Sequence, residues 1–478
     1  MLLPLCLFDC FTISLVALRQ RSRTHFVFST VISETNNLDI LIIGAGAAGL
    51  MAAIACGERA QKDNINLRLR VLDSQTKIGA KILVAGGGRC NVTNAQVDAS
   101  RFETSHAERG NKSFVARILR SFSVEETHRF FERLDVPLKL EPEMGKYFPV
   151  ADSGKVVLRA LLDAAHNAGA HLVTGCAVAN IEYSNDENLW RVETSQGLLQ
   201  SRAIVLCTGG LALPKSGSDG RGLRFAKKLG HELIETTPAL TPLLAQPAIH
   251  SNLSGVTLPA RLFLKHEGRI VADFTGSFLF THIGYSGPVA LNISRHFARL
   301  KLKNPQSKAQ IFMRLLTDVK DGEEGAWWHS FVQKNAKKNV ANALAELLPR
   351  RIAESIHEYS IEYSMSRDLP LGRLARAQHE HIKTALFACA LPVHQVADYV
   401  KAETTAGGVS LDDIESATMM SKRCDGLFFA GEICDVDGWL GGYNFQWAWS
   451  SGAVAGRSAA KYAMKIANQL EALATGEL

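Results

Sequence analysis

The sequence predicts an α/β protein in which a Rossmann-like dinucleotide-binding domain is built from both ends of the chain and interrupted by an insert. Three observations carry this prediction. An apolar strand runs into a glycine-rich turn and a helix near residue 44, a second apolar strand runs into a glycine-rich segment near residue 431, and residues 240–400 follow a different pattern. At 478 residues the chain is also longer than one hydrophobic core usually organises, so more than one domain is expected.

The composition is that of a globular protein. Hydrophobic residues make up 46% and charged residues 21% of the chain. After residue 18 no apolar run approaches the length of about 20 residues that a membrane-spanning helix needs, which excludes a polytopic membrane protein. The nine cysteines are an odd number, and no pair has the spacing of a CxxC or zinc motif. We therefore expect reduced thiols and no metal site.

The first 37 residues differ from the rest of the chain. They contain eight Ser and Thr residues, three arginines and only two acids, which is typical of a cleaved organelle transit peptide. The apolar stretch 2–18 also fits a signal or anchor sequence, although it lacks an N-terminal positive region, and a misassigned start codon is a third alternative. We expect a transit peptide or disordered extension, a plastid or mitochondrial location, and no membrane contact after processing. Without a transit peptide, the expected location is the cytoplasm.

A GxGxxG motif opens the dinucleotide-binding part in the setting that the motif requires, between an apolar strand and a helix of small residues. Gly44 permits the tight turn, Gly46 removes a side chain that would block a pyrophosphate, and Gly49 lets the helix pack against the strand. The first helical residues, Ala47 and Ala48, then direct free N–H groups at the phosphates. The motif predicts a dinucleotide site.

A second strand completes this βαβ unit. Residues 67–72 are apolar at alternate positions and end at Asp73, whose carboxylate can accept hydrogen bonds from both ribose hydroxyls of an adenosine. The unit does not distinguish FAD from NAD, because both cofactors use it. The choice depends on features elsewhere in the chain.

The segment 79–94 favours a flavin. Three consecutive glycines at 86–88 expose backbone that a flat ligand can approach closely, and a simple hairpin would need fewer. A cation, a thiol and two amides follow within a turn or two, as the polar edge of a flavin ring requires. Expected contacts in this segment are Lys81, Gly87, Gly88, Arg89 and Asn91.

Two later strands are expected to reach the same cofactor. Residues 171–177 lead into Val178, at the place where flavoproteins with two dinucleotide folds read adenine with backbone groups. Residues 203–210 form a buried strand that ends in Thr208 and Gly209, where a glycine lets the chain pass beside the cofactor. Each strand alone is ordinary β-core, and their order along the chain supports the prediction.

The C-terminal segment 426–452 supplies the other half of the predicted site. Its strand ends in an acid that can accept hydrogen bonds from ribityl hydroxyls, and its glycines precede a helix that begins near residue 443. The positive end of that helix suits the flavin edge that gains negative charge on reduction. Expected contacts here are Gly431, Glu432, Gly441, Gly442, Asn444 and Gln446.

With these segments the chain resembles the BaiN/YhiN-type family of NAD(P)/FAD-dependent flavoproteins. The most specific segments are Gly-Gly-Gly-Arg-Cys-Asn at 86–91 and Gly-Glu-Ile-Cys-Asp-Val-Asp-Gly at 431–438. Arg221 stands where the family usually has an acid. The resemblance implies a two-dinucleotide-binding-domain flavoprotein whose Rossmann-like FAD domain is interrupted by a substrate domain with a β-rich and a helical part.

The residue pattern agrees with this organisation. Residues 240–310 alternate short β-type runs with Gly and Pro, and residues 335–400 have helical periodicity. We therefore expect an FAD-binding domain over 38–239 and 401–478 and a substrate domain over 240–400.

The resemblance implies the reduction of an activated C=C bond, in an RNA uridine or a small-molecule enone, with NAD(P)H as the electron source. Only one GxGxxG is visible, so NAD(P)H is expected to dock transiently. The reaction needs a hydride at one carbon and a proton at the other. Candidate proton donors are Cys90, His282 and Tyr443. The alternatives are a flavin amine oxidase of the aminoacetone type and a flavin-bearing binding protein with structural FAD.

The net charge of +6 is unevenly placed. Between residues 240 and 395, 19 Lys and Arg residues outnumber 12 Asp and Glu residues, an excess of seven, and the remainder of the chain is close to neutral. This excess favours ribosomal RNA slightly over a small molecule as the partner, and a solvated basic face is the simpler alternative. Candidate phosphate contacts in the helical stretch are Arg350, Arg351, Arg373 and Arg376. No pattern indicates an oligomeric state.

Overall fold

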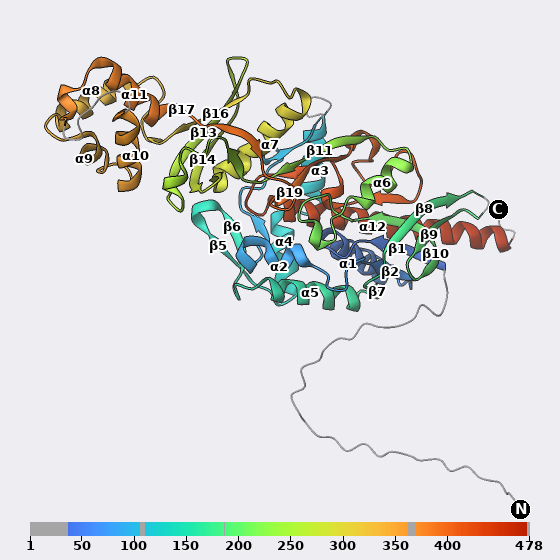
Figure 1. The fold of residues 1–478 in the computed structure, drawn as a ribbon. Helices are drawn as coiled ribbons and strands as arrows, with labels where there is room; N and C mark the ends of the chain where they lie inside the picture. Colours follow the sequence, from blue (N-terminus) through green and yellow to red (C-terminus); the bar gives the residue numbers. More distant parts are fainter. Residues whose placement is uncertain (1–36, 106–109, 186, 362–368, 476–478) are drawn as a thin grey trace, which may run out of the picture.

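The computed structural model describes residues 37–105, 110–185, 187–361 and 369–475. The predicted extension 1–37 lies outside the described residues apart from Asn37, which begins the first strand. Figure 1 shows an α/β body and an elongated second part that ends in a cluster of helices. None of the helices in the described ranges is both long and apolar enough to cross a membrane.

A seven-stranded sheet forms the centre of the body. Its order is β7-β2-β1-β10-β9-β8, with β20 paired to the C-terminal half of β10. The strands β7, β2, β1, β10 and β20 run parallel, whereas β8, β9 and β10 form an antiparallel meander. The strand bounds are β1 Asn37–Ile43, β2 Leu69–Leu72, β7 Ala170–Val173, β8 Val178–Ser184, β9 Leu189–Thr194, β10 Gly197–Leu206 and β20 Leu427–Phe429.

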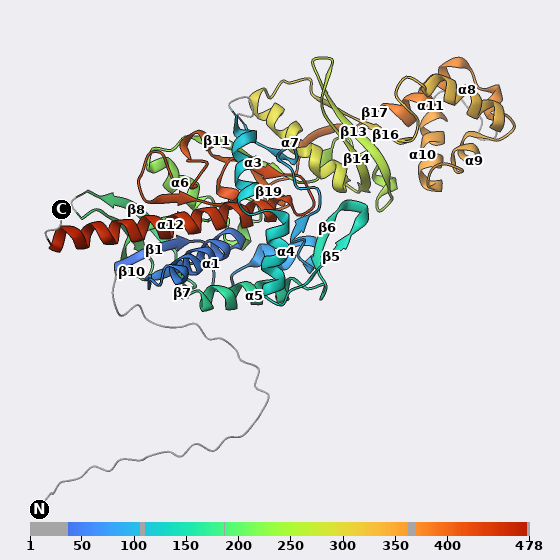
Figure 2. The ribbon, with the colours of Figure 1, turned by 180° about the vertical axis from the view of Figure 1, so that it is seen from behind.

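Helices cover both faces of this sheet, because its central strands carry apolar side chains on both faces and both faces must be buried. The helices are α1 Ala47–Lys62, α2 Ala80–Val84, α3 Asn111–Ser121, α4 Val124–Arg133, α5 Gly154–Asn167, α6 Arg221–Lys228 and α12 Tyr443–Thr475. Figure 2 shows α12 running alongside α1. Small residues permit this contact: a Cβ on Gly452 would lie 2.5 Å from the Ala48 carbonyl oxygen, and one on Gly456 2.2 Å from that of Ala52.

Three small sheets surround the body. The first has the strand order β3-β6-β5, with bounds β3 Thr93–Asn94, β6 Lys146–Pro149 and β5 Leu138–Glu141. The second pairs β4 (Phe102–Glu103) with β21 (Asp437–Gly438). The third pairs β11 (Leu233–Ala239) with β19 (Thr404–Val409) in antiparallel orientation. These last two strands carry the chain out of the body and back into it.

The second part of the molecule is a mostly antiparallel sheet in the order β17-β16-β13-β14-β15-β12-β18, with helix α7 packed against it and four helices at its far end. Its core gathers residues between 243 and 391. The bounds are β12 Leu243–Ala245, β13 Thr257–His266, β14 Arg269–Thr281, β15 Gly284–Ser286, α7 Pro288–Lys303, β16 Gln310–Arg314, α8 Glu324–Asn335, α9 Val340–Leu344, α10 Arg350–Ile361, α11 Arg376–Phe387, β17 Cys389–Ala390 and β18 Val393–Val396.

The predicted fold class, a Rossmann-like α/β domain with a β-rich and helical insert, is confirmed. The predicted boundaries 38–239, 240–400 and 401–478 stay predictions, although the two hydrophobic cores fall on either side of them.

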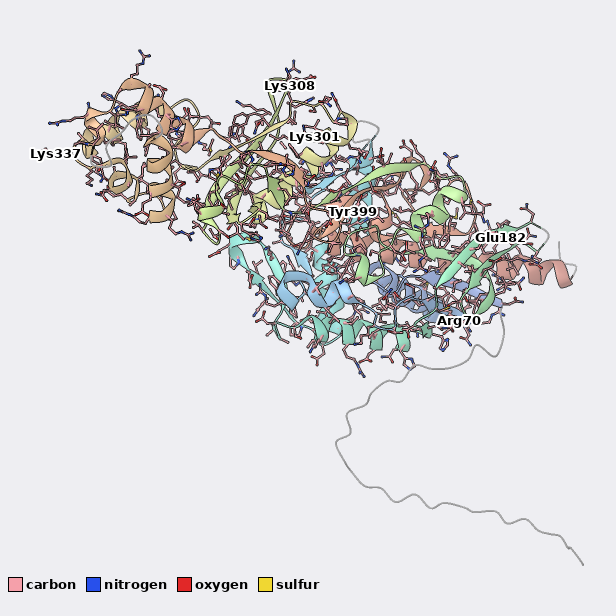
Figure 3. All side chains as sticks on the ribbon, viewed as in Figure 1. Arg70, Glu182, Lys301, Lys308, Lys337 and Tyr399 are labelled. Atoms are coloured by element: carbon pink, nitrogen blue, oxygen red, sulfur yellow. The ribbon has the colours of Figure 1, made fainter. Side chains whose placement is uncertain are left out.

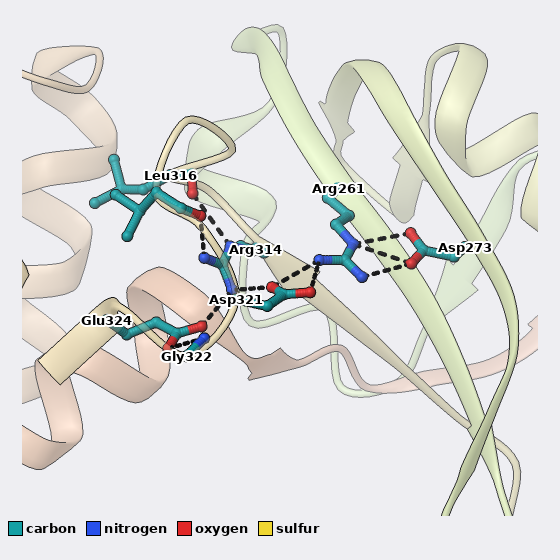
Figure 4. Close-up of polar contacts among 8 residues, drawn as sticks. Arg261, Asp273, Arg314, Leu316, Asp321, Gly322 and Glu324 are labelled. Carbon is teal, nitrogen blue, oxygen red and sulfur yellow. Dashed lines mark hydrogen bonds and ion pairs between the residues drawn. The ribbon is translucent and has the colours of Figure 1, made fainter.

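An arginine–carboxylate network joins the second sheet to its helices (Figure 4). Arg261 on β13 pairs with Asp273 on β14 and with Asp321. Arg314, at the end of β16, pairs with the same Asp321 and with Glu324 at the start of α8. The Arg314 side chain is only 5% exposed, so its pairing is what allows it to be buried.

Candidate active site

A cavity of about 620 Å³ lies where the parallel strands β1, β2, β10 and β20 end. This is the edge at which open α/β sheets bind ligands, and the volume lies within the usual range for a ligand site. Segments from both ends of the chain line it. We call the part lined by Gly46 and Asp73 the Gly46 end, and the part lined by Asn91, Trp439 and Gly441 the Gly441 end.

The glycines of the first motif have the separate roles that the sequence suggested. Gly44 has a φ of +104°, and a Cβ there would lie 2.4 Å from the Cys207 carbonyl oxygen. A Cβ on Gly49 would lie 1.8 Å from the Gly44 carbonyl oxygen, so Gly49 packs the helix under the turn and does not line the cavity. A Cβ on Gly46 would meet nothing within 4 Å. This open space lies in front of the first turn of α1.

Asp73 is held in place at the Gly46 end. One carboxylate oxygen accepts the backbone N–H of Ala45 and the other that of Gln75, both at 2.8 Å. Burial raises the pKa of Asp73, while these two hydrogen bonds lower it. Each oxygen keeps a lone pair for a further donor. Val178 lines the same part of the cavity.

The glycine run 86–88 turns the chain sharply. Gly86, Gly87 and Gly88 have φ values of +58°, +70° and +89°, and Cys90 follows at +65°. A Cβ on Gly87 would meet nothing within 4 Å, because this residue opens on to the cavity, whereas Gly88 does not line it. The guanidinium of Arg89 lies 3.9 Å from the centroid of the Phe148 ring and pairs with a carboxylate on β5.

Glu432 connects the two halves of the site. One of its oxygens pairs with Lys81 at 2.5 Å and the other accepts the backbone N–H of Thr405 at 3.0 Å. The Asn444 amide holds the backbone N–H and carbonyl of Gly438, each at 2.9 Å. These contacts fix the loop that leads into α12 against segments from residues 81 and 405.

Most predicted contacts therefore meet at one cavity. Those that line it are Gly44, Gly46, Ala47, Ala48, Asp73, Lys81, Gly87, Arg89, Asn91, Val178, Thr208, Gly209, Gly431, Glu432, Gly441, Gly442 and Asn444.

The structure does not place the Gln446 side chain at the cavity. Its side-chain oxygen accepts hydrogen bonds from the hydroxyls of Thr93 and Thr127, and its amide nitrogen donates to Phe122 and Ser450. All four hydrogen-bonding positions of the amide are thus used inside the protein. Gln446 is fully buried and holds α12 to its neighbours.

None of the three predicted proton donors lines the cavity. Cys90 is fully buried in the core, and burial raises its pKa to about 12. His282 lies exposed in the turn between β14 and β15. Tyr443 begins α12 with its ring packed edge-on against Phe102 at 6.0 Å. Nearness in sequence to a glycine loop does not fix where a side chain points, and the prediction for these residues is not supported.

Sequence reasoning missed many of the residues that line the cavity, among them Lys146, Glu403, Thr404 and Trp439. The only available signal was the position of Glu403 and Thr404, directly before a Thr-Ala-Gly-Gly segment shared with the family. Trp439 also contacts the second part of the molecule, with its ring centroid 4.9 Å from that of Phe274 on β14.

The Gly441 end contains buried polar atoms that no described residue satisfies. They are the side-chain oxygens of Asn91 and Thr404 and the indole nitrogen of Trp439. A buried polar atom without a partner costs free energy, so three of them around one cavity indicate a polar ligand. Together with the open space at Gly46 and Gly87, they fit a dinucleotide with a polar ring, such as FAD.

Comparison with known proteins identifies the family. The HI0933-like protein Rossmann domain matches residues 38–458. The chain belongs to this family. The match confirms the resemblance stated from the sequence. The protein is therefore an FAD-dependent oxidoreductase.

Two relatives carry the names of different activities. The 3-dehydro-bile acid delta(4,6)-reductase of Clostridium scindens is 30% identical over 420 residues, which cover 88% of this chain and 98% of the relative. The ribosomal RNA dihydrouridine synthase of Escherichia coli is 30% identical over 420 residues, covering 86% of this chain and 96% of the relative.

The cavity shows which groups of the protein would hold FAD. Gly46, the first turn of α1 and Asp73 would hold the adenosine and pyrophosphate, and Asn91 with the start of α12 would hold the flavin ring. When bound, FAD supplies a carrier that accepts and releases a hydride equivalent.

Proposed function

We propose that the protein reduces a C=C bond conjugated to a carbonyl group and takes its electrons from NAD(P)H. The observation that carries the proposal is the Gly441 end of the cavity, where unsatisfied polar groups lie beside the segment predicted to hold the flavin ring. The two relatives support it, because a steroid-type enone and a uracil ring both present a C=C bond next to a carbonyl.

The residues at this end suit such a reaction. The N–H groups at the start of α12, after Gly441 and Gly442, are placed to stabilise negative charge that develops beside them. Apolar walls from Trp439, Leu440 and Phe445 limit the access of water. The chain has one GxGxxG motif, so NAD(P)H would reach the site without a Rossmann domain of its own.

Anaerobic half-reactions test the proposal. The FAD-loaded protein is mixed with NADH or NADPH, and the loss of visible flavin absorbance is followed. The reduced protein is then mixed with progesterone, a steroid enone, or with protein-free ribosomal RNA. We expect bleaching by one nicotinamide and reoxidation by one of the two substrates.

Three results would overturn the proposal. One is reduced flavin that neither substrate reoxidises. Flavin that neither nicotinamide bleaches would indicate a binding protein with structural FAD. Reduction by aminoacetone followed by rapid reoxidation by O₂ would indicate an amine oxidase.

Ribosomal RNA is favoured as the substrate by the position of the positive charge. Residues 240–315 contain nine Lys and Arg residues against two acids, whereas residues 316–395 contain ten of each. The excess thus belongs to the sheet and α7, and the helical stretch is neutral. Figure 3 shows Lys301 and Lys308 on the same upper side of this sheet region, and the end of α7 also carries the exposed Lys303.

The helical arginines fit a phosphate contact less well than the sequence suggested. Arg350 pairs with Glu354, and Arg351 donates to the carbonyl oxygens of Asn252 and Ser254. Arg373 and Arg376 are exposed on the neutral stretch.

These positions provide a matched test of RNA binding. Reversing Lys303 and Lys308 to Glu should weaken binding to ribosomal RNA. The slope of the logarithm of the binding constant against the logarithm of the salt concentration should become less steep by about two. Reversing Arg373 and Arg376 to Glu makes the same change of charge on the helical stretch and should have little effect. If the two double variants bind ribosomal RNA equally well and keep the same flavin content, a small-molecule substrate is favoured.

A further inference from the structure

Two charged side chains at the cavity have no role in holding the site together. Eight charged residues line the cavity, and six of them are engaged by other protein groups. Lys81 pairs with Glu432, Arg221 with Asp219, and Arg89 with a carboxylate on β5, while Asp73 accepts two backbone N–H groups. The remaining two are Lys146 and Glu403.

Neither Lys146 nor Glu403 forms an ion pair or side-chain hydrogen bond with another residue in the described ranges. Lys146 begins β6, and Glu403 directly precedes β19, so they enter the cavity from different sheets. Their charges still interact across it: desolvation lowers the pKa of Lys146 and raises that of Glu403, and the charge of each group opposes the shift of the other. A cation and a carboxyl group facing a shared space are therefore available to a ligand.

Their neighbours place both groups at the Gly441 end. The Cε atom of Lys146 lies 3.5 Å from where a Cβ on Gly441 would be. Glu403 adjoins Thr404, whose hydroxyl oxygen is one of the buried atoms without a partner. The pair thus lies at the end of the cavity where chemistry on a substrate is expected.

We propose that Glu403 donates the proton in the reduction and that Lys146 binds the carbonyl oxygen of the substrate. This inference rests on the proposed function. The bound, reduced cofactor would supply a hydride equivalent to the β carbon of the substrate and would be oxidised by that transfer. The π electrons of the C=C bond shift toward the carbonyl, and negative charge grows on the oxygen beside Lys146. The α carbon then takes the proton of the Glu403 carboxyl group, and the resulting carboxylate regains a proton from water.

The electrostatics of the cavity support these roles. Part of the Glu403 side chain faces the open cavity, yet the protein around it raises its pKa by desolvation, more than Lys146 lowers it. The carboxyl group therefore keeps its proton at a higher pH than an ordinary glutamate. Desolvation lowers the pKa of Lys146, and the charges of Glu403 and Glu141 oppose that shift.

Three variants test the assignment: Glu403→Gln, Lys146→Met, and Glu143→Gln as the matched control. Glu143 is exposed in the turn between β5 and β6 and does not line the cavity. The probe is whichever of progesterone and ribosomal RNA reoxidises the reduced wild-type protein. We expect Glu403→Gln to be reduced by NAD(P)H at the wild-type rate and reoxidised by the probe about 100-fold more slowly. The control should match the wild type in both steps.

Binding to the oxidised protein provides a readout that does not depend on turnover. Titration with the probe is followed by the change in the flavin spectrum. Glu403→Gln should bind with unchanged Kd, whereas Lys146→Met should bind about tenfold more weakly. Unchanged reoxidation in Glu403→Gln, or a large loss of probe binding in it, would overturn the assignment while the proposed function stands. If neither probe reoxidises the wild-type protein, both the proposed function and this assignment are overturned.

Discussion

The two ends of the cavity differ in how their polar groups are satisfied. At the Gly46 end, both oxygens of Asp73 already accept backbone hydrogen bonds. At the Gly441 end, Asn91, Thr404 and Trp439 each keep a buried polar atom without a protein partner, and Glu403 is unpaired. At the Gly46 end, the protein's own backbone thus fixes the orientation of the acid. The Gly441 end keeps its hydrogen-bonding capacity for ligands, which is what a site of chemistry needs.

The largest effect is expected at the Gly46 end. Gly46→Asp should abolish FAD binding, because it places a carboxylate where the pyrophosphate is expected. A Cβ at this position meets nothing within 4 Å, so the fold should tolerate the change. The ratio of flavin to protein after purification measures the effect. Gly325→Asp is the control, because a Cβ at Gly325 on α8 also meets nothing within 4 Å, and it should keep the full flavin content. Recovery of stoichiometric flavin in Gly46→Asp would contradict the role of the glycine turn.

The next largest effect tests what holds the Gly441 end. Arg295 on α7 forms a buried ion pair with Asp437, two residues before Trp439. Arg295→Met leaves this carboxyl group buried without its cation and should lower the free energy of unfolding by about 3–5 kcal/mol at neutral pH. Urea unfolding of the FAD-free protein measures the loss, and adding Asp437→Leu should restore most of it.

The decrease in the free energy of unfolding that Arg295→Met causes should also depend on pH. Burial raises the pKa of Asp437 to about 6 in the folded protein, from an ordinary value near 3.8. An acid with a raised folded pKa destabilises the folded state increasingly as the pH rises between these two values. Below about pH 6 the carboxyl group of the folded protein is protonated with or without Arg295 and needs no cation, so the difference between variant and wild type should shrink there. A difference that stays constant between pH 4 and pH 8 would argue against the buried pair as its cause.

A smaller effect is expected from the acid at the Gly46 end. Asp73→Asn keeps an acceptor for one backbone N–H and presents a donor to the other, so it should weaken FAD binding by about 1–3 kcal/mol. Titration of the FAD-free protein with FAD gives the Kd. Asp98→Asn, at an exposed position outside the cavity, is the matched control. If FAD affinity is the same in both variants, Asp73 does not contact the cofactor.

The smallest effect is expected at Cys90. The thiol packs in the core and not at the cavity, so Cys90→Ala should cost about 1 kcal/mol of stability and leave flavin content and both half-reactions near wild type. Stopped-flow measurement of the two half-reactions tests this. If Cys90→Ala slows substrate reduction as much as is expected for Glu403→Gln, Cys90 takes part in the reaction.

The sequence was sufficient to predict the parts of the site that depend on backbone geometry. Gly44 and Gly49 are required by close approaches of the chain to itself, and such requirements appear as a local pattern. The strand that precedes Gly431 was predictable for the same reason. The inserted sheet was predictable only in outline, because the order of its strands depends on pairings such as β12 with β18, about 150 residues apart.

The rest of the site depended on partners that are distant in sequence. Whether Gln446 faces a ligand or the protein is decided by Thr93 and Thr127, more than 300 residues earlier. Cys90 follows a run of left-handed residues, whose side-chain directions cannot be inferred from their order. Lys146 and Glu403 stand in unremarkable stretches, and only the pairing of β6 with β3 and of β19 with β11 brings them to the cavity.

The closure of the central sheet by β20 and α12 has a consequence for synthesis of the protein. Strand β10 is complete at residue 206, but the neighbour of its C-terminal half is β20, which begins at residue 427. At about 5–20 residues per second, a ribosome needs roughly 10–45 s to make the intervening chain. During that time the end of β10 has an open edge, and the face of α1 that later meets Gly452 and Gly456 is uncovered. The nascent chain is therefore most exposed to aggregation in this interval, and it can capture FAD only near the end of translation.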